Sequence, residues 1–115
     1  MMTAESTMAG VSLAWLLEGL SAGGPVPDVE VSGLATDSRQ VRPGDLFLAS
    51  QGLQVHGLAY VDQAIRQGAG AVAWQPVHDS ELAGRVAGLA LPSVAVPGLA
   101  QKLGLIADRF YVHPS

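Results

Sequence analysis

The fold of this chain is decided by residues 45–75, DLFLASQGLQVHGLAYVDQAIRQGAGAVAWQ. Residues 45–49 and 71–75 are short, mainly apolar runs, which predict two buried strands. Between them, apolar residues recur at helical spacing and predict a helix; they are Leu58, Val61, Ala64 and Ile65. Gly68 and Gly70 suit the end of that helix. A strand, a helix and a strand in this order predict parallel neighbours joined by a right-handed crossover.

The segments on either side extend this pattern. Ser12 suits the N-cap of a short helix, which residues 21–25 end. Its apolar residues are Leu13, Leu16, Leu17 and Leu20. Residues 29–34 alternate between apolar and polar, which predicts one half-buried strand leading to Thr36. Pro43 and Gly44 predict a type II turn with Gly44 at its third position.

The C-terminal third contains weaker signals and then a clear helix. Residues 80–86 predict a short helix, and residues 93–96 predict a short buried strand. The last helix has an apolar stripe made of Leu99, Leu103, Ile106 and Phe110. Pro97 suits its first turn, and residues 113–114 end it. We therefore predict an α/β fold, a small layered Rossmann-like domain with a largely parallel sheet flanked by helices.

Composition limits the function. The chain has 115 residues, of which 49% are hydrophobic and 14% charged, so one compact domain is expected. Its net charge of -4 argues against nucleic-acid binding, and we expect no membrane insertion and a cytoplasmic location. The first ten residues lack the basic start of a secretory signal. The chain contains no Cys, which excludes disulfides, thiolate zinc sites and cysteine nucleophiles.

Several familiar catalytic and binding motifs are absent or misplaced. Residues 68–73 match the dinucleotide pattern G-x-G-x-x-A, but they leave a helix and enter a strand, which is the reverse of that fingerprint. Lys102 is the sole lysine, has no phosphate-binding loop before it, and is expected to be a solvated helix position. His56, His78 and His113 lack metal-ligand spacing, so we expect no metal site, although His56 stands out in a glycine-flanked loop. No nucleophile elbow occurs.

Two loops remain as candidates for a small-molecule site. Residues 36–39, Thr-Asp-Ser-Arg, follow a strand at the edge where open α/β folds bind ligands. The alternative is a local turn in which Arg39 pairs with Asp37 or Asp45. Residues 51–57 lead into a helix whose free N–H groups would suit an anionic group, although a plain connection is the alternative. Both loops follow successive strands and are expected to converge.

The order of these residues resembles the N-terminal domain of the Mur ligases of peptidoglycan synthesis. The resemblance rests on residues 37–49, DSRQVRPGDLFLA, on Gly52 and Gly57, and on residues 64–69, AIRQGA. It covers roughly residues 29–115. The ending at residues 107–115, ADRFYVHPS, is most similar to that of the family's tripeptide synthetases.

The resemblance implies a role in binding substrate. Residues 1–28 would be a tail, a short helix and a linker, and residues 29–115 would bind the UDP part of UDP-N-acetylmuramoyl-L-alanyl-D-glutamate. The positions carried over for UDP contact are Thr36, Ser38, Leu53, Gln54 and Val55. Those expected to shape the loops are Asp37, Arg39, Gly52, His56 and Gly57. The family usually has Asp where this chain has His56.

The resemblance also implies what lies elsewhere. The whole enzyme would use ATP and Mg²⁺ to join meso-diaminopimelate or L-lysine to the substrate, with central and C-terminal domains beyond residue 115. These 115 residues alone are then not expected to be active, to contain catalytic residues or to hold a cofactor or metal. Two alternatives stay open. The chain is the same domain of the ligase that adds D-Ala-D-Ala, or it is a non-catalytic interaction module with this fold.

Overall fold

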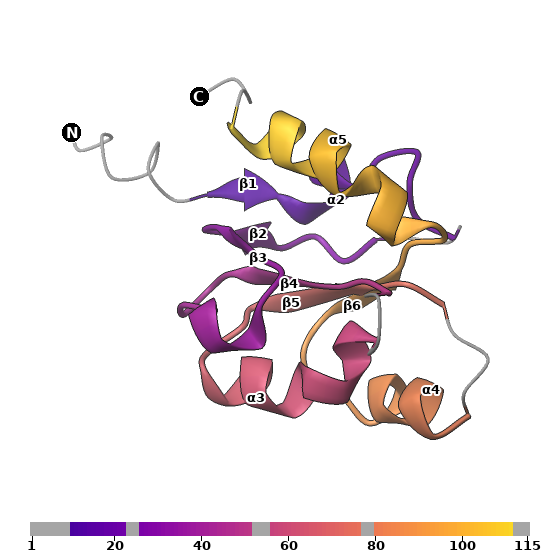
Figure 1. Ribbon diagram of the computed structural model, residues 1–115. Coiled ribbons are helices and arrows are strands. Elements are labelled where there is room, and N and C mark those ends of the chain that lie inside the picture. Colours follow the sequence, from indigo (N-terminus) through magenta and orange to yellow (C-terminus); the bar gives the residue numbers. More distant parts are fainter. Residues whose placement is uncertain (1–9, 23–25, 52–55, 77–79, 112–115) are drawn as a thin grey trace.

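A central sheet carries helices on both faces in the computed structural model, which describes residues 10–22, 26–51, 56–76 and 80–111 (Figure 1). The N-terminal elements are β1 (Val11–Ser12), α2 (Leu13–Leu16), β2 (Glu30–Val31), β3 (Leu34–Ala35) and the 3-10 helix η1 (Ser38–Gln40). The middle elements are β4 (Leu46–Ala49), the 3-10 helix η2 (Gly57–Tyr60), α3 (Val61–Arg66) and β5 (Ala71–Trp74). The last elements are α4 (Ser80–Ala87), β6 (Ser93–Ala95) and α5 (Leu99–Tyr111). The predicted α/β class is confirmed.

The main sheet is parallel throughout the described residues and has the strand order β3-β4-β5-β6. Residues 46–49 pair in register with residues 71–74, as the strand-helix-strand pattern predicts. The connections through α3 and α4 lie on one face of the sheet, whereas α2 and α5 lie on the other (Figure 1). The parallel orientation of the strands therefore brings the carboxyl ends of all four described strands to one edge.

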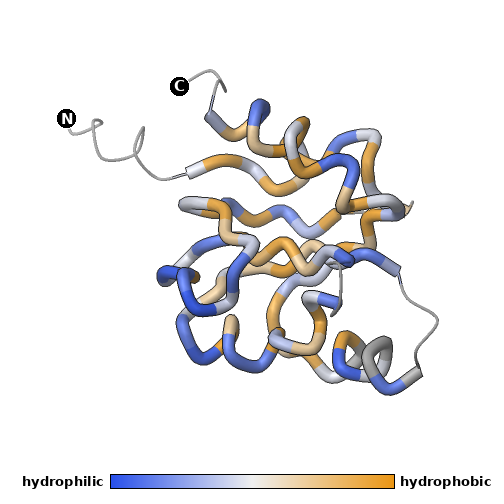
Figure 2. The backbone as a smooth tube through the Cα atoms, in the orientation of Figure 1, coloured by the Kyte–Doolittle hydropathy of each residue, from blue (hydrophilic) through white to orange (hydrophobic). Residues whose placement is uncertain are grey.

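Strand β4 joins two hydrophobic cores. Leu46 and Leu48 belong to a cluster with residues of α2 and α5, whereas Phe47 and Ala49 belong to a second cluster with residues of η2 and α3. A strand covered on both faces has no polar side, which explains its continuous apolar run. Figure 2 shows hydrophobic colouring along these central strands.

The predicted strand over residues 29–34 is wrong as a single element. Val31 pairs with Val11 in a separate antiparallel ribbon, whereas Leu34 pairs with Leu46 in the main sheet. Gly33 lies between them, and a Cβ there would stand 2.6 Å from Oδ1 of the buried Asp45. The chain passes from one sheet to the other at a glycine, where any Cβ would require the Asp45 carboxylate to move.

The predicted turn is confirmed and explains two further glycines. Asp45 N–H donates to the Arg42 carbonyl at 3.0 Å, and Gly44 has φ +88°. Gly44 N–H in turn donates to the carbonyl of Gly68 at 2.9 Å, and a Cβ on Gly68 would lie 2.9 Å from Pro43 Cα. Gly68, with φ +107°, thus follows α3 and packs against the turn, as expected for a helix end rather than a dinucleotide fingerprint.

The remaining helices follow the sequence with small corrections. The α2 helix has Ser12 as its N-cap but is shorter than predicted, because residues 17–20 form turns. The α5 helix begins at Leu99, so Pro97 precedes its first turn. Lys102 is half-buried and its Nζ donates to the Pro97 carbonyl at 2.7 Å, so it is not a purely solvated position. None of the helices in the described ranges is long and apolar enough to cross a bilayer.

Candidate functional site

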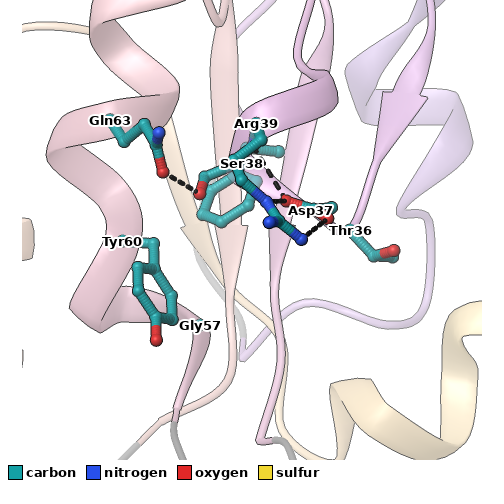
Figure 3. Close-up of a pocket in the computed structure, with 8 residues that line it drawn as sticks. Thr36, Asp37, Ser38, Arg39, Gly57, Tyr60 and Gln63 are labelled. Carbon is teal, nitrogen blue, oxygen red and sulfur yellow. Dashed lines mark hydrogen bonds and ion pairs between the residues drawn. The ribbon is translucent and has the colours of Figure 1, made fainter.

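A cavity of about 470 Å³ opens beside the carboxyl ends of β3 and β4. Its volume falls in the range of about 300–1,000 Å³ that is usual for small-molecule sites. Its lining residues come from the loop after β3, from β4, and from η2 and α3 (Figure 3). They are Thr36, Asp37, Ser38, Arg39, Phe47, Gly57, Tyr60 and Gln63.

Asp37 and Arg39 form a self-contained turn at one side of the cavity. Asp37 Oδ1 accepts from the backbone N–H of Arg39 at 2.9 Å and from Arg39 Nε at 3.1 Å, and Oδ2 accepts from Nη2 at 2.9 Å. The hydrogen bonds from Arg39 hold the pKa of the Asp37 carboxyl below its usual value, and the same side-chain contact raises the pKa of Arg39. The local turn with an Asp37–Arg39 pair is therefore present at the cavity.

Ser38 is the buried polar residue of this loop. Its side chain is 5% exposed, and its hydroxyl donates to Gln63 Oε1 at 2.7 Å (Figure 3). One helical turn later, Gln67 Nε2 donates to the Arg39 carbonyl at 3.2 Å. Two glutamines on the α3 side therefore hold η1 in place at two consecutive residues.

His56 is buried and acts as a cap. It is 5% exposed; Nδ1 accepts from Leu58 N–H at 3.0 Å, and Nε2 lies 2.9 Å from the Gln75 carbonyl oxygen. Because Nδ1 accepts, the hydrogen resides on Nε2 and is donated to Gln75. An Asp at this position would offer the same kind of acceptor to Leu58. His56, the histidine that stood out in the sequence, is thus a buried structural cap, and His78 and His113 lie outside the described residues.

The N–H groups at the start of η2 have protein acceptors. Gly57 N–H donates to the Ser50 carbonyl at 2.8 Å, and Ala59 N–H donates to the His56 carbonyl at 3.0 Å. Leu58 N–H is taken by the imidazole, as described above. The expectation of free N–H groups for an anion is therefore wrong at these three positions.

The structure brings the first predicted loop together with Gly57, the last residue of the second. Thr36, Asp37, Ser38, Arg39 and Gly57 line the cavity, whereas His56 is buried and is not among the lining residues. The other predicted positions lie outside the described residues, and they are Gly52, Leu53, Gln54 and Val55.

Sequence reasoning missed Phe47, Tyr60 and Gln63, which also line the cavity. Positions 57, 60 and 63 recur every third residue, and this spacing places them beside the apolar face of the same helical segment. That periodicity was the available signal. Within the described ranges, no three His, Asp or Glu side chains gather as a group that would hold a metal ion.

Comparison with known proteins gives the same family by sequence and by fold. A model of the "Mur ligase family, catalytic domain" matches residues 30–111. The UDP-N-acetylmuramoyl-L-alanyl-D-glutamate--2,6-diaminopimelate ligase of Xanthomonas campestris is 44% identical over 88 residues, which cover 76% of this chain. The ligase of the same name from Alkalilimnicola ehrlichii is 45% identical over 94 residues, also 76% of this chain. This chain spans 17–18% of the length of these two relatives.

Among solved structures, a crystal structure of MurF from Acinetobacter baumannii has a TM-score of 0.59 and 21% identity. The match covers 84% of this chain and 20% of that one. At this identity the likeness is one of fold. The family model, the curated relatives and the parallel sheet agree, and the chain belongs to the Mur ligase family.

Proposed function

We propose that this chain is the N-terminal, substrate-binding part of a UDP-N-acetylmuramoyl-L-alanyl-D-glutamate–diamino acid ligase of peptidoglycan synthesis, and that its cavity holds the uridine end of the UDP group. The observation that carries the proposal is the cavity itself, because it joins the loop of residues 36–39 to Gly57. Of these, residues 37–39 and Gly57 belong to the motifs on which the resemblance to the family rests. The relatives that are 42–47% identical and carry this ligase name support the diamino acid enzyme over the ligase that adds D-Ala-D-Ala.

The chemistry of the cavity suits a nucleoside. Tyr60 offers a half-exposed aromatic ring, and the buried Ser38 offers a hydroxyl oxygen. A flat base needs an apolar surface to stack on and a few placed polar atoms for selection. Phe47 is an apolar residue of the cavity lining and is 1% exposed. We assign Thr36 and Ser38, with Leu53, Gln54 and Val55, to the UDP group.

ATP and Mg²⁺ belong, in this proposal, to the rest of the ligase. The described residues provide no ligand cluster for a metal ion and no phosphate-binding loop at Lys102. The domains that would hold ATP and select meso-diaminopimelate or L-lysine are expected C-terminal to residue 115. The chain on its own would then bind the substrate weakly and catalyse nothing.

A titration tests this proposal. UDP-N-acetylmuramoyl-L-alanyl-D-glutamate is added to the ¹⁵N-labelled chain, and we expect amide shifts concentrated at residues 36–39 and 57–63. Ser38→Ala should weaken binding about tenfold, since a lost hydrogen bond costs about 1–1.5 kcal/mol. Ser32→Ala is the matched control, because Ser32 Oγ donates to the Pro43 carbonyl at 3.2 Å and does not line the cavity.

The outcomes separate the alternatives. Shifts with the dipeptide substrate and with UDP alone support the proposal. Absence of shifts at millimolar ligand contradicts it and favours the non-catalytic interaction module.

A further inference from the structure

The geometry points to Gln63 as a specificity-determining positioning residue: by accepting the Ser38 hydroxyl hydrogen, it turns Ser38 into a pure acceptor that selects a base with an imide N–H, uracil, over cytosine. The inference rests on the proposed function, since it concerns the base that the same cavity takes. Gln63 was not among the site residues predicted from the sequence, and its hydrogen bond to Ser38 was not predicted either.

The first step of the argument concerns the hydrogen of Ser38. A serine hydroxyl has one hydrogen to donate and two lone pairs that accept. The 2.7 Å bond to Gln63 Oε1 uses that hydrogen. Because Ser38 is 5% exposed, little water competes for the hydroxyl, and the bond is expected to persist with a ligand present. Toward the cavity, Ser38 Oγ then presents lone pairs only.

The second step concerns the bases. Uracil carries an N3–H donor between two carbonyl oxygens, whereas cytosine has a bare N3 acceptor at the same position. An acceptor-only hydroxyl pairs with the uracil N3–H and opposes the cytosine N3 lone pair. A site built around a committed hydrogen bond rejects the analogue that leaves it unmatched.

The third step concerns rigidity. Gln63 and Gln67 lie one helical turn apart and both reach η1, one through the Ser38 side chain and the other through the Arg39 backbone. Only Gln63 determines which way the hydroxyl hydrogen points. A purely structural role would be shared by both glutamines, whereas a role in selecting the base belongs to Gln63.

The experiment measures the affinities of UDP and CDP for the 115-residue chain by amide titration. We expect the unmodified chain to prefer UDP about tenfold or more, the change expected from one mismatched buried hydrogen bond. Gln63→Met replaces the amide with an apolar side chain of similar size and so removes the acceptor. It should bring the ratio of the UDP and CDP affinities close to one. Gln63→Glu keeps an acceptor for the Ser38 hydroxyl. Its added negative charge should weaken the binding of UDP and of CDP by the same factor, so the ratio of the two affinities should equal that of the unmodified chain. Gln67→Met is the matched control and should leave the ratio unchanged.

Each result decides the matter. The role of Gln63 is overturned if Gln63→Met keeps the preference for UDP over CDP, or if Gln63→Glu loses that preference as Gln63→Met does. In either case, binding of UDP to the unmodified chain still supports the proposed function. Loss of the ratio in Gln67→Met also overturns it, since the effect would then be a general loosening of η1. If the unmodified chain binds neither nucleotide nor the dipeptide substrate, the proposed function fails and this inference fails with it. Amide spectra of each variant without nucleotide show whether it is folded.

Discussion

The His56 imidazole links the start of η2 to the end of β5, because its Nε2 lies 2.9 Å from the carbonyl oxygen of Gln75. Gln75 follows β5, and its side-chain Oε1 accepts from Gln51 N–H at 3.2 Å and from Ala100 N–H at 3.0 Å. Gln75 therefore contacts the two ends of the loop after β4 and the start of α5. The two described ends of that loop, Gln51 and His56, are therefore both hydrogen-bonded to Gln75.

His56→Ala should destabilise the chain by about 1–3 kcal/mol, since it leaves the Leu58 N–H and the Gln75 carbonyl without their partner. His56→Asp should lose less stability, because a carboxylate can still accept the hydrogen bond from Leu58 N–H. Urea unfolding at neutral pH measures both. Ser12→Ala, which removes the exposed cap of α2, is the control and should cost about 1 kcal/mol. Equal stability of His56→Ala and the unmodified chain would contradict the assigned role.

Gly57→Ala should disturb the cavity from its edge. A Cβ there would lie 2.7 Å from Ala49 Cα, and backbone cannot yield as a flexible side chain does. We expect a loss of about 1–3 kcal/mol in unfolding free energy and weaker nucleotide binding. Gly104→Ala is the matched control, because nothing lies within 4 Å of its Cβ position in α5. It should gain about 0.5–1 kcal/mol and leave binding unchanged. A neutral Gly57→Ala would show that the loop shifts freely.

The sheet could be predicted because β4 and β5 are buried on both faces. Residues 46–49 and 71–74 are therefore continuous apolar runs, and the glycines after α3 mark the helix end. The short ribbon of β1 and β2 could not be predicted, since two residues show no period. The break at Gly33 depends on Asp45, a carboxylate twelve positions away whose location only the folded chain defines.

The lining of the cavity was predictable in the loop after β3 and not in the helix. Thr36 to Arg39 stand out as polar residues after an apolar strand, and the structure places them at the cavity. Gln63 looks like an ordinary solvated helix residue until the strand order brings α3 against η1. The buried state of His56 could not be predicted from its loop, because its hydrogen-bond partner Gln75 lies nineteen positions later in the chain.

The Asp37 carboxyl should titrate below its ordinary pKa of 3.8, because its bonds to Arg39 favour the charged form. A carboxyl with a lowered folded-state pKa stabilises the fold above the ordinary value and loses that contribution as pH falls through the lowered pKa. The stability difference between the chain and Asp37→Asn should thus be fully present above the ordinary value of 3.8 and be lost as the pH falls through the lowered pKa. Carboxyl-carbon NMR shifts give the pKa, and Arg39→Met should return it toward 3.8. An unshifted pKa would contradict the pair.

Arg109 should stabilise the junction of α5 with the N-terminal helix. Its Nη1 donates to the Leu16 carbonyl at 3.0 Å and to the Glu18 carbonyl at 2.8 Å, across more than ninety positions of sequence. Arg109→Met should cost about 1–3 kcal/mol in urea unfolding, because two carbonyls at the end of α2 lose a charged donor. Arg66→Met, at the last residue of α3, is an exposed control and should stay within about 0.5 kcal/mol. An equal cost for the two variants would refute a specific role for Arg109.

Arg39→Met should weaken the binding of uridine and the binding of UDP by the same modest factor. Two of the five guanidinium N–H groups bind Asp37, and this pairing shapes the turn that presents Ser38. Loss of turn geometry affects the nucleoside whether or not it carries phosphates. Parallel amide titrations with uridine and UDP measure the two factors, and high salt should not separate them. A loss for UDP more than about tenfold greater than for uridine would mean that Arg39 binds the diphosphate directly, since a charge-assisted bond is worth about 1.5–3 kcal/mol.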